Sequence, residues 1–253
     1  ALKATLYENF TDVDSVYAVN PNIVDDPKEI HTLTYKEMRE LSYAGFGVFH
    51  EEALAPAVRA GIPVCIKNTN NPEAQGTMIV AKRERNENPV VGIASDKGFM
   101  NIYVEKYLMN REIGFGRKLL QILEEEGLSY EHTPSGIDSL NVVLRANQLS
   151  EEKEQRLIQR IKTELHVDKV EIERNIALIM IVGEGMHETV GVAAKAVTAI
   201  QSVNVNIDMI NQGSSEVSMM FGVHEDDVEK AVAAIYNAYF KKKAYVKQLE
   251  AIQ

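Results

Sequence analysis

The feature that most constrains the fold of this chain is an internal duplication. When the sequence is shifted by 77 positions, residues 100–144 align with residues 177–221 without a gap, and the hydrophobic pattern matches throughout. Gly114 coincides with Gly191. A period of this length exceeds that of solenoid repeats and indicates two copies of one small domain. We call these two segments, each with the helix that follows it, the first repeat and the second repeat.

Each repeat is predicted to contain the same order of elements. A strand and a Gly-containing turn precede a helix with an apolar stripe, and two further strands and a second helix follow. In the first repeat the expected elements are a strand 100–105, a helix 115–126, strands 128–133 and 140–144, a helix after the N-cap Ser150 and a closing strand 169–173. In the second repeat they are a strand 177–182, a helix 192–202, strands 205–210 and 217–223 and a helix around 228–235. The order βαββαβ predicts a ferredoxin-like fold.

The first 80 residues lie outside the duplication and read as α/β material. The expected elements are a strand 5–11, a helix opened by a capping box of Thr34 and Glu37, a helix 51–60 and strands 62–66 and 77–80. A polar stretch without hydrophobic periodicity, KRERNEN at 82–88, is typical of an inter-domain linker. We therefore expect domains at 1–81, 91–174 and 175–253, with a linker at 82–90.

Composition excludes several classes of function. The 253 residues carry a net charge of -10, which argues against nucleic acid as a partner. The aliphatic run 177–182 is far shorter than the roughly 20 residues that cross a bilayer, so no membrane partner is expected. The single cysteine, Cys65, lies in a strand-like run and fits a buried position in a protein of the reducing cytoplasm. The sequence begins with Ala1 and has neither an initiator Met nor a signal sequence, so we expect it to be cut from a longer protein.

Motifs for other chemistry are absent or incomplete. His50 and Glu51 resemble the start of a zinc motif, but no second histidine follows one turn on. Ser214 and Ser215 follow a glycine without the strand-turn-helix context of a nucleophile elbow. Lys241 and the two lysines after it are interpreted as a solvated helix end. No metal site is predicted.

Several ordered segments resemble the aspartate kinase family. TDVDSVYAVNP at 11–21, LTYKEMRELSYAGFGVFHEEAL at 33–54 and AGIPVCIKNTNNPEAQGT at 60–77 are similar to the C-terminal part of its amino-acid-kinase domain. The duplicated unit resembles the paired ACT domains of the same family. The resemblance implies a mixed α/β chain: the tail of an αβα amino-acid-kinase domain followed by two ferredoxin-like ACT domains.

In that family the TDV-x-x-x-Y segment lines the ATP pocket, so the resemblance implies nucleotide contacts for Thr11, Asp12 and Tyr17. Alternatively, Asp12 forms a turn and Tyr17 belongs to the core. The family often shows DPR at 20–22, where this chain has Asn-Pro-Asn, and often a Lys in place of Gly47. The resemblance therefore implies no role in neutralising phosphate at those two places.

The family's KFGGTS and GRGGSD segments, which hold phosphates, are absent from this sequence. We therefore assign no catalytic residues to this chain and expect it to be inactive alone. The resemblance implies that the intact enzyme converts ATP and L-aspartate to 4-phospho-L-aspartate, the first step toward lysine, threonine and methionine, with ATP and Mg as substrate and cofactor. The fragment itself requires no cofactor.

The first repeat has the features of an amino-acid sensor. Gly114 and Gly116 flank a helix start whose backbone N–H groups can hold a carboxylate. Glu131 and Asp138, with Ser129, could hold two ammonium groups, which favours lysine. Alternatively, the two carboxylates are ordinary surface residues of a strand and a turn.

The resemblance to lysine-sensitive aspartate kinases implies that the inhibitor lies at a dimer interface between like ACT copies. The matching positions are Met109, Phe115, Gly116, Ser129, Tyr130, Glu131, Ser135 and Asp138. In the second repeat, Asp208 matches Glu131, but Ser215 matches Asp138 and Ala193 matches Gly116, so lysine should bind there less well. Expected partners are lysine or threonine, a second copy of the chain and the N-terminal part of the kinase. A complete enzyme and a free-standing sensor or non-catalytic subunit stay open as alternatives.

Overall fold

The structure, a computed structural model, describes residues 4–47, 51–84, 88–212 and 217–241, and for 51–53 it describes the backbone alone. The chain forms two compact units. Unit 1 consists of residues 1–96 and 178–253, and unit 2 of residues 97–177. Unit 1 therefore combines the N-terminal region with most of the second repeat, whereas unit 2 holds the first repeat.

The N-terminal part of unit 1 is a small α/β layer. Four strands form a sheet in the order β1-β5-β6-β4, with bounds Tyr7–Thr11, Val64–Asn68, Thr77–Val80 and Thr32–Thr34. Strand β1 runs parallel to β5, whereas β5 and β6 are antiparallel. The short strands β2 (Val16–Tyr17) and β3 (Glu29–Ile30) pair separately. The helices are α1 (Tyr35–Tyr43) and α2 (Glu51–Ala60).

Helix α1 begins where the sequence predicts. The Thr34 hydroxyl accepts from the Glu37 amide at 3.2 Å, and the Glu37 carboxylate accepts from the Thr34 amide at 3.0 Å, so the capping box is confirmed. Met38 and Leu41 are buried on the same side of the helix. Cys65 is also buried, as its strand-like surroundings predict.

The rest of unit 1 belongs to the second repeat. Its elements are the end of β9 (Lys169–Val182), the 3-10 helix η3 (Glu184–Glu188), α5 (Val192–Ser202), β10 (Met209–Asn211), β11 (Ser218–His224), η4 (Glu225–Asp227) and α6 (Val228–Phe240). The predicted helix 192–202 is confirmed at both ends.

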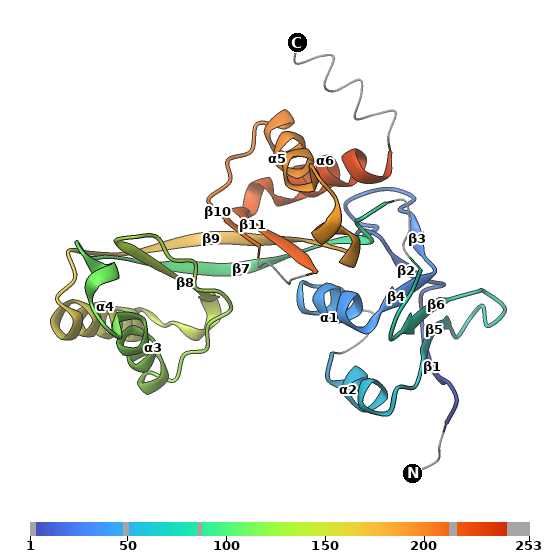
Figure 1. Ribbon diagram of the computed structural model, residues 1–253, viewed down its shortest axis with the longest axis horizontal. Coiled ribbons are helices and arrows are strands. Elements are labelled where there is room, and N and C mark those ends of the chain that lie inside the picture. The colour runs from blue at the N-terminus through green and yellow to red at the C-terminus, as the bar shows by residue number, and fades with distance from the viewer. Residues whose placement is uncertain (1–3, 48–50, 85–87, 213–216, 242–253) are drawn as a thin grey trace. The chain divides into compact units, whose positions relative to one another are not determined.

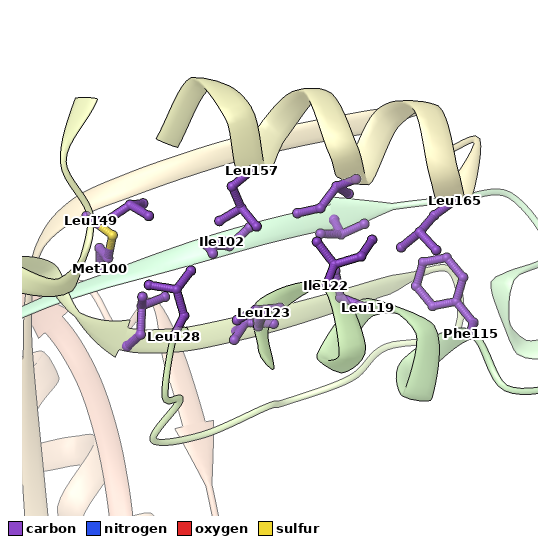
Figure 2. Packing of buried hydrophobic residues seen from close by; sticks show 14 of the residues in the cluster. Met100, Ile102, Phe115, Leu119, Ile122, Leu123, Leu128, Leu149, Leu157 and Leu165 are labelled. Atoms are coloured by element: carbon purple, nitrogen blue, oxygen red, sulfur yellow. The ribbon is translucent and has the colours of Figure 1, made fainter. Parts of the chain in front are cut away.

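Unit 2 packs two helices on one face of its strands (Figure 1). Its elements are the part of β7 (Gly92–Glu105) from Lys97 onward, η1 (Met109–Arg111), α3 (Phe115–Glu125), β8 (Ser139–Arg145), η2 (Ala146–Gln148), α4 (Glu151–Leu165) and the start of β9. Ser150 caps α4 by accepting from the Lys153 amide, as predicted. Alternate residues of β7, including Ile102, point toward Leu119 and Leu123 of α3 and Leu157 of α4 to form a closed hydrophobic core (Figure 2).

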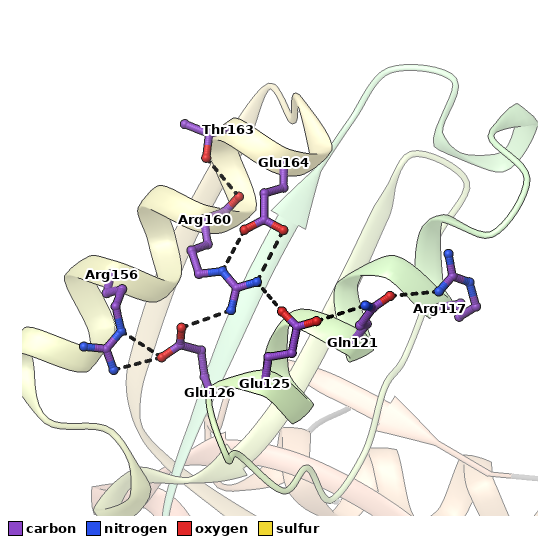
Figure 3. A network of polar contacts seen from close by, with 8 residues as sticks. All are labelled: Arg117, Gln121, Glu125, Glu126, Arg156, Arg160, Thr163 and Glu164. Carbon is purple, nitrogen blue, oxygen red and sulfur yellow. Dashed lines mark hydrogen bonds and ion pairs between the residues drawn. The ribbon is translucent and has the colours of Figure 1, made fainter.

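Salt bridges link the ends of the two helices of unit 2. Arg160 of α4 binds Glu126, which follows α3, at 3.1 Å and Glu164 of its own helix at 2.7 Å (Figure 3). Arg156 also binds Glu126, at 2.9 Å. These arginines hold the pKa of the Glu126 carboxyl below its ordinary value. The network fixes α3 against α4 at the rim of the core.

The duplication extends to single hydrogen bonds. The Met109 amide donates to Lys106 O at 3.0 Å, and the Met186 amide donates to Gly183 O at 3.1 Å, so the turn after the first strand is the same in both repeats. Gly127 and Asn204, 77 positions apart, both have left-handed backbones, with φ of 64° and 54°. A shared backbone conformation at matching positions confirms the duplicated fold.

Two predictions of strands are wrong in detail. The strands predicted at 169–173 and 177–182 form one strand, β9, although Asn175 between them has a left-handed backbone with φ 60°. Residues 128–133 form no regular strand, and the only pairing described there is a single bridge from His132 to Val143. The backbone of Ser129 bonds to the side-chain amide of Gln148 instead of to a neighbouring strand. The five-stranded sheet therefore has the order β10-β11-β9-β7-β8.

The segment 82–88 was predicted to be a polar linker. It has no regular secondary structure at 82–84 and 88. However, the Arg83 side chain is only 7% exposed and binds Glu37, so part of this segment is packed and not solvated.

Candidate functional site

The turn between β7 and α3 lies beside the segment that contains the predicted carboxylate Asp138. The Lys106 amide donates to Asp138 O at 2.9 Å, which joins the start of the turn to the residue before β8. Gly114 takes a left-handed conformation with φ 77°, and no side chain caps the helix that it opens. A Cβ atom at Gly116 would meet Leu140 at 4.0 Å, an ordinary contact. Among the described residues, the first turn of α3 therefore has no side-chain cap.

Two of the predicted effector residues are walls of the core. Phe115 is 3% exposed and Met109 is 7% exposed, and both belong to the hydrophobic cluster of unit 2. The Lys106 ammonium lies 5.7 Å from the centre of the Phe115 ring. These two residues shape the turn from within, and their side chains offer little surface to a ligand.

Glu131 is placed by a β-bulge. The amides of Glu131 and His132 both donate to Val143 O, at 2.8 and 3.4 Å, so two residues oppose one residue of β8. A Glu131 oxygen lies 3.7 Å from Nε of Arg145. The amide bond to Val143 and the contact with Arg145 hold Glu131 beside β8.

One copy of the chain does not bring the two predicted carboxylates together. Glu131 lies opposite Val143, whereas Asp138 directly precedes Ser139, the first residue of β8. Val143 and Asp138 are five residues apart, which is about 17 Å at 3.3 Å per residue. Ser135 lies near Asp138, since it bridges to Leu140. The predicted residues therefore form two groups along one edge strand.

The residues next to Glu131 border a groove of about 1180 Å³ along the outer face of α3. Tyr130, 47% exposed, and Ser129 line the groove. Its further lining residues, which the sequence reasoning missed, include Arg117 and Gln121. Their signal was present, because both lie on the polar face of an amphipathic helix.

A cluster of charges also escaped the sequence reasoning. Glu112, in the turn before α3, binds the ammonium groups of Lys106 at 2.6 Å and Lys118 at 2.7 Å. These two hydrogen bonds lower the pKa of the Glu112 carboxyl to about 2. The pairing fixes the turn at the entrance to the helix N-terminus.

We expect the stabilising effect of Glu112 to depend on pH. Because its folded-state pKa is lowered, the stabilisation is present above the unfolded-state pKa of about 4.3 and disappears as pH falls toward 2. Glu112→Gln should therefore be less stable than the wild type at pH 6, and the difference should be much smaller at pH 2. Urea denaturation at both pH values measures this. An equal difference at both would contradict it.

Two of the three predicted nucleotide-binding residues, Thr11 and Asp12, lie at the carboxyl end of β1, which is parallel to β5, whereas Tyr17 lies in the short strand β2. Thr11 ends β1 opposite Asn68 of β5, and the Thr11 hydroxyl bonds to Asp12 at 3.2 Å. Asp14 accepts from Asn68 at 2.7 Å. Burial raises the pKa of Tyr17, and the charges of Glu29, Asp14 and Asp26 raise it further. Strand ends of this kind are where open α/β sheets bind ligands.

Asp14 and Asn68 are therefore candidate site residues that the sequence reasoning missed. Asn68 ends β5 opposite the predicted residue Thr11, and Asp14 lies two residues after Asp12 in the loop behind β1, which was the available signal. The polar groups at this edge are hydroxyl, carboxylate and amide, which fit the ribose and phosphate-bound metal of a nucleotide.

Neither a membrane-spanning helix nor a metal-holding cluster is found among the described residues. None of the helices within 4–47, 51–84, 88–212 and 217–241 is long and apolar enough to cross a membrane. The same part of the chain contains no group of three His, Cys, Asp or Glu side chains arranged to hold a metal ion.

Family models match both ends of the chain. The model of the amino acid kinase family matches residues 1–68, and an ACT domain model matches residues 179–239. Aspartokinase 3 of Bacillus subtilis is 63% identical over 239 residues, which cover 94% of this chain and 53% of that protein. The chain is homologous to the C-terminal region of aspartokinases. It spans about half the length of that aspartokinase.

Solved aspartokinase structures have the same fold. Aspartate kinase of Clostridium acetobutylicum superposes with a TM-score of 0.89 at 48% identity, over 94% of this chain and 55% of that one. Aspartokinase III of E. coli, in complex with lysine and aspartate, superposes with a TM-score of 0.76 at 25% identity, over 94% of this chain and 53% of that one. These matches confirm the predicted fold class, an amino-acid-kinase tail joined to ACT regulatory structure.

Proposed function

We propose that this chain is the regulatory region of an aspartate kinase and that its first repeat binds lysine as a feedback inhibitor. One observation carries the choice of site. Among the described residues, Oδ1 of Asp138 is a buried oxygen that has no hydrogen-bond partner. A buried carboxylate oxygen is costly unless a donor reaches it. An ammonium group bound beside the turn at Lys106 would supply that donor.

The other groups of the first repeat fit the rest of an amino acid. The open N-terminus of α3 offers N–H groups to a carboxylate. Glu131 supplies a second carboxylate for the second ammonium of lysine. Because Glu131 and Asp138 lie far apart along β8, we propose that two copies of the chain associate at this edge, so that each ligand contacts groups from both. The E. coli homologue with lysine bound supports lysine over threonine.

The activity of the whole protein is also a proposal. A homologue, aspartokinase III of E. coli, has been solved with aspartate and ADP, at 25% identity to this chain. We propose the transfer of phosphate from ATP to L-aspartate, with Thr11, Asp12 and Tyr17 in contact with the nucleotide. Magnesium, when bound, would neutralise charge on the phosphates. The remainder of the kinase domain would complete the site for aspartate.

Lysine titration of charge-neutral variants tests the effector site. Glu131→Gln and Asp138→Asn should each weaken lysine binding about ten- to a hundredfold, because each removes a charge-assisted hydrogen bond of about 1.5 to 3 kcal/mol. Asp208→Asn is the matched control, since Asp208 is the equivalent of Glu131 in the second repeat, and it should leave lysine affinity nearly unchanged. Calorimetry gives the affinities, with threonine titrated in parallel.

Two results would contradict this assignment. Lysine affinity that survives both first-repeat substitutions but is lost in Asp208→Asn would place the sensor in the second repeat. Tighter binding of threonine than of lysine would identify threonine, and not lysine, as the effector.

A further inference from the structure

The same backbone N–H group is bound by a carboxylate in both repeats. In the first repeat, the Tyr107 amide donates to Oδ2 of Asp168 at 2.6 Å. In the second repeat, the Glu184 amide donates to Oε1 of Glu37 at 3.0 Å. Tyr107 and Glu184 are 77 positions apart and occupy the same place in the turn that the Met109 and Met186 amides close. The turn after the first strand is thus a carboxylate-binding turn in each copy.

The two carboxylates come from different parts of the chain. Asp168 belongs to the first repeat itself and directly precedes β9. The equivalent position in the second repeat is residue 245, which lies outside the described residues and is Tyr in the sequence, so no carboxylate is encoded there. Glu37 instead comes from helix α1 of the N-terminal region. A side chain from the kinase tail therefore takes the place of the repeat's own acid.

Glu37 is held as an ion and not merely buried. Its side chain is 0% exposed, and Arg83 binds both of its oxygens, at 2.7 and 2.8 Å. The Thr34 amide adds a third donor and the Glu184 amide a fourth. Burial raises the pKa of Glu37, but the Arg83 guanidinium and the two amides outweigh it, so the pKa lies below its ordinary value.

The turn also packs closely against Pro89, and α1 contacts a second donor of the repeat. A Cβ atom at Gly183 would lie 2.1 Å from Pro89 O, and one at Gly185 would lie 2.9 Å from Pro89 Cα. Only glycine at these two positions therefore lets the turn lie this close to Pro89. The Ser218 hydroxyl, at the start of β11, donates to Glu40 at 2.8 Å. Glu37 and Glu40 are one helical turn apart, so α1 presents two carboxylates to donors of the second repeat.

We propose that Glu37 is a positioning residue that occupies the carboxylate-binding turn of the second repeat as an internal ligand. The geometry of this turn is then set by the kinase tail, whereas the first repeat sets its own with Asp168. A displacement of α1 must move the turn, and a displacement of the turn must move α1. The inference goes beyond the proposed effector site, because it holds whichever amino acid the first repeat binds.

Hydrogen exchange at two matched amides tests this assignment in the 253-residue chain. Glu37→Gln keeps the volume but removes the charge, so exchange at the Glu184 amide should accelerate about ten- to a hundredfold, whereas exchange at the Tyr107 amide should not change. Asp168→Asn should do the reverse, with faster exchange at Tyr107 and no change at Glu184. NMR of labelled protein resolves the two amides.

The pattern of the two variants separates positioning from general loss of stability. Unchanged exchange at Glu184 in Glu37→Gln, or equal acceleration at both amides, would overturn the proposal. If Glu37→Gln fails to fold, Glu37→Asp keeps the charge and shortens the reach. It should then accelerate exchange at Glu184 alone, and acceleration at both amides would again overturn the proposal. Lysine affinity is measured separately, so failure here is distinguishable from failure of the effector site.

Discussion

Replacing Arg83 with methionine is expected to lower the free energy of unfolding by about 3–5 kcal/mol, because it leaves the buried Glu37 carboxylate without its cation. Methionine preserves most of the side-chain length, so the loss reports the charge. Urea denaturation followed by circular dichroism measures the change. Lys82→Met is the matched control, since Lys82 is the exposed neighbour, and it should change stability by less than about 0.5 kcal/mol.

The effect of Arg83→Met should also depend on pH. Glu37 has a lowered pKa in the folded chain, so its ion pair stabilises above the unfolded-state pKa of about 4.3, and this stabilisation is lost as pH falls. The difference between Arg83→Met and the wild type should therefore shrink in acid. A loss below about 1 kcal/mol at neutral pH would mean that the pair is not buried in solution.

Replacing Phe115 with alanine is expected to destabilise unit 2 by about 3–5 kcal/mol, because the ring is buried in the core between α3 and the sheet (Figure 2). Any loss of lysine binding in this variant would follow from the loss of structure. Denaturation of unit 2, followed by exchange of β7 and β8 amides, measures the effect.

Gly116→Ala is the informative partner to this change. The added methyl group meets Leu140 only at 4.0 Å, and alanine favours a helix over glycine, so stability should be unchanged or slightly higher. A ligand that approaches the first turn of α3 should nevertheless bind less tightly. A large loss of stability in Gly116→Ala, or no loss in Phe115→Ala, would contradict the assignment of Phe115 to the core and of Gly116 to the ligand-binding turn.

Local patterns in the sequence predicted the elements well where local forces determine them. The pair Thr34 and Glu37 predicted the start of α1, and Gly191 with the apolar stripe after it predicted α5. The segment 128–133 was predicted incorrectly because its backbone bonds to the side chain of Gln148 and because two of its residues, Glu131 and His132, oppose the single residue Val143. The hydrophobic periodicity of a segment does not show which hydrogen bonds its backbone makes with other parts of the chain.

The same distinction applies to the candidate sites. Gly114 and Gly116 were identifiable because a helix start has a local signature. The contact of Glu37 with Glu184 was not, because 147 positions separate the two residues and the capping box already accounted for Glu37. Once the capping box explained Glu37, nothing in the sequence pointed to its second contact, the hydrogen bond from the Glu184 amide. Asp14 and Asn68 were missed for a related reason, since they become neighbours only when β1 pairs with β5.

Strands β7 and β9 have a consequence for engineering. The chain enters residues 97–177 along β7 and leaves along β9, and these two strands are neighbours in the sheet. The first repeat is therefore inserted into the sequence of unit 1, and the strands by which the chain enters and leaves it are paired with each other. We expect that residues 97–177 can be exchanged between homologues as one segment, provided that the junctions in β7 and β9 keep the register of these two strands. A single cut at either strand would sever a hydrogen-bonded ladder as well as the chain.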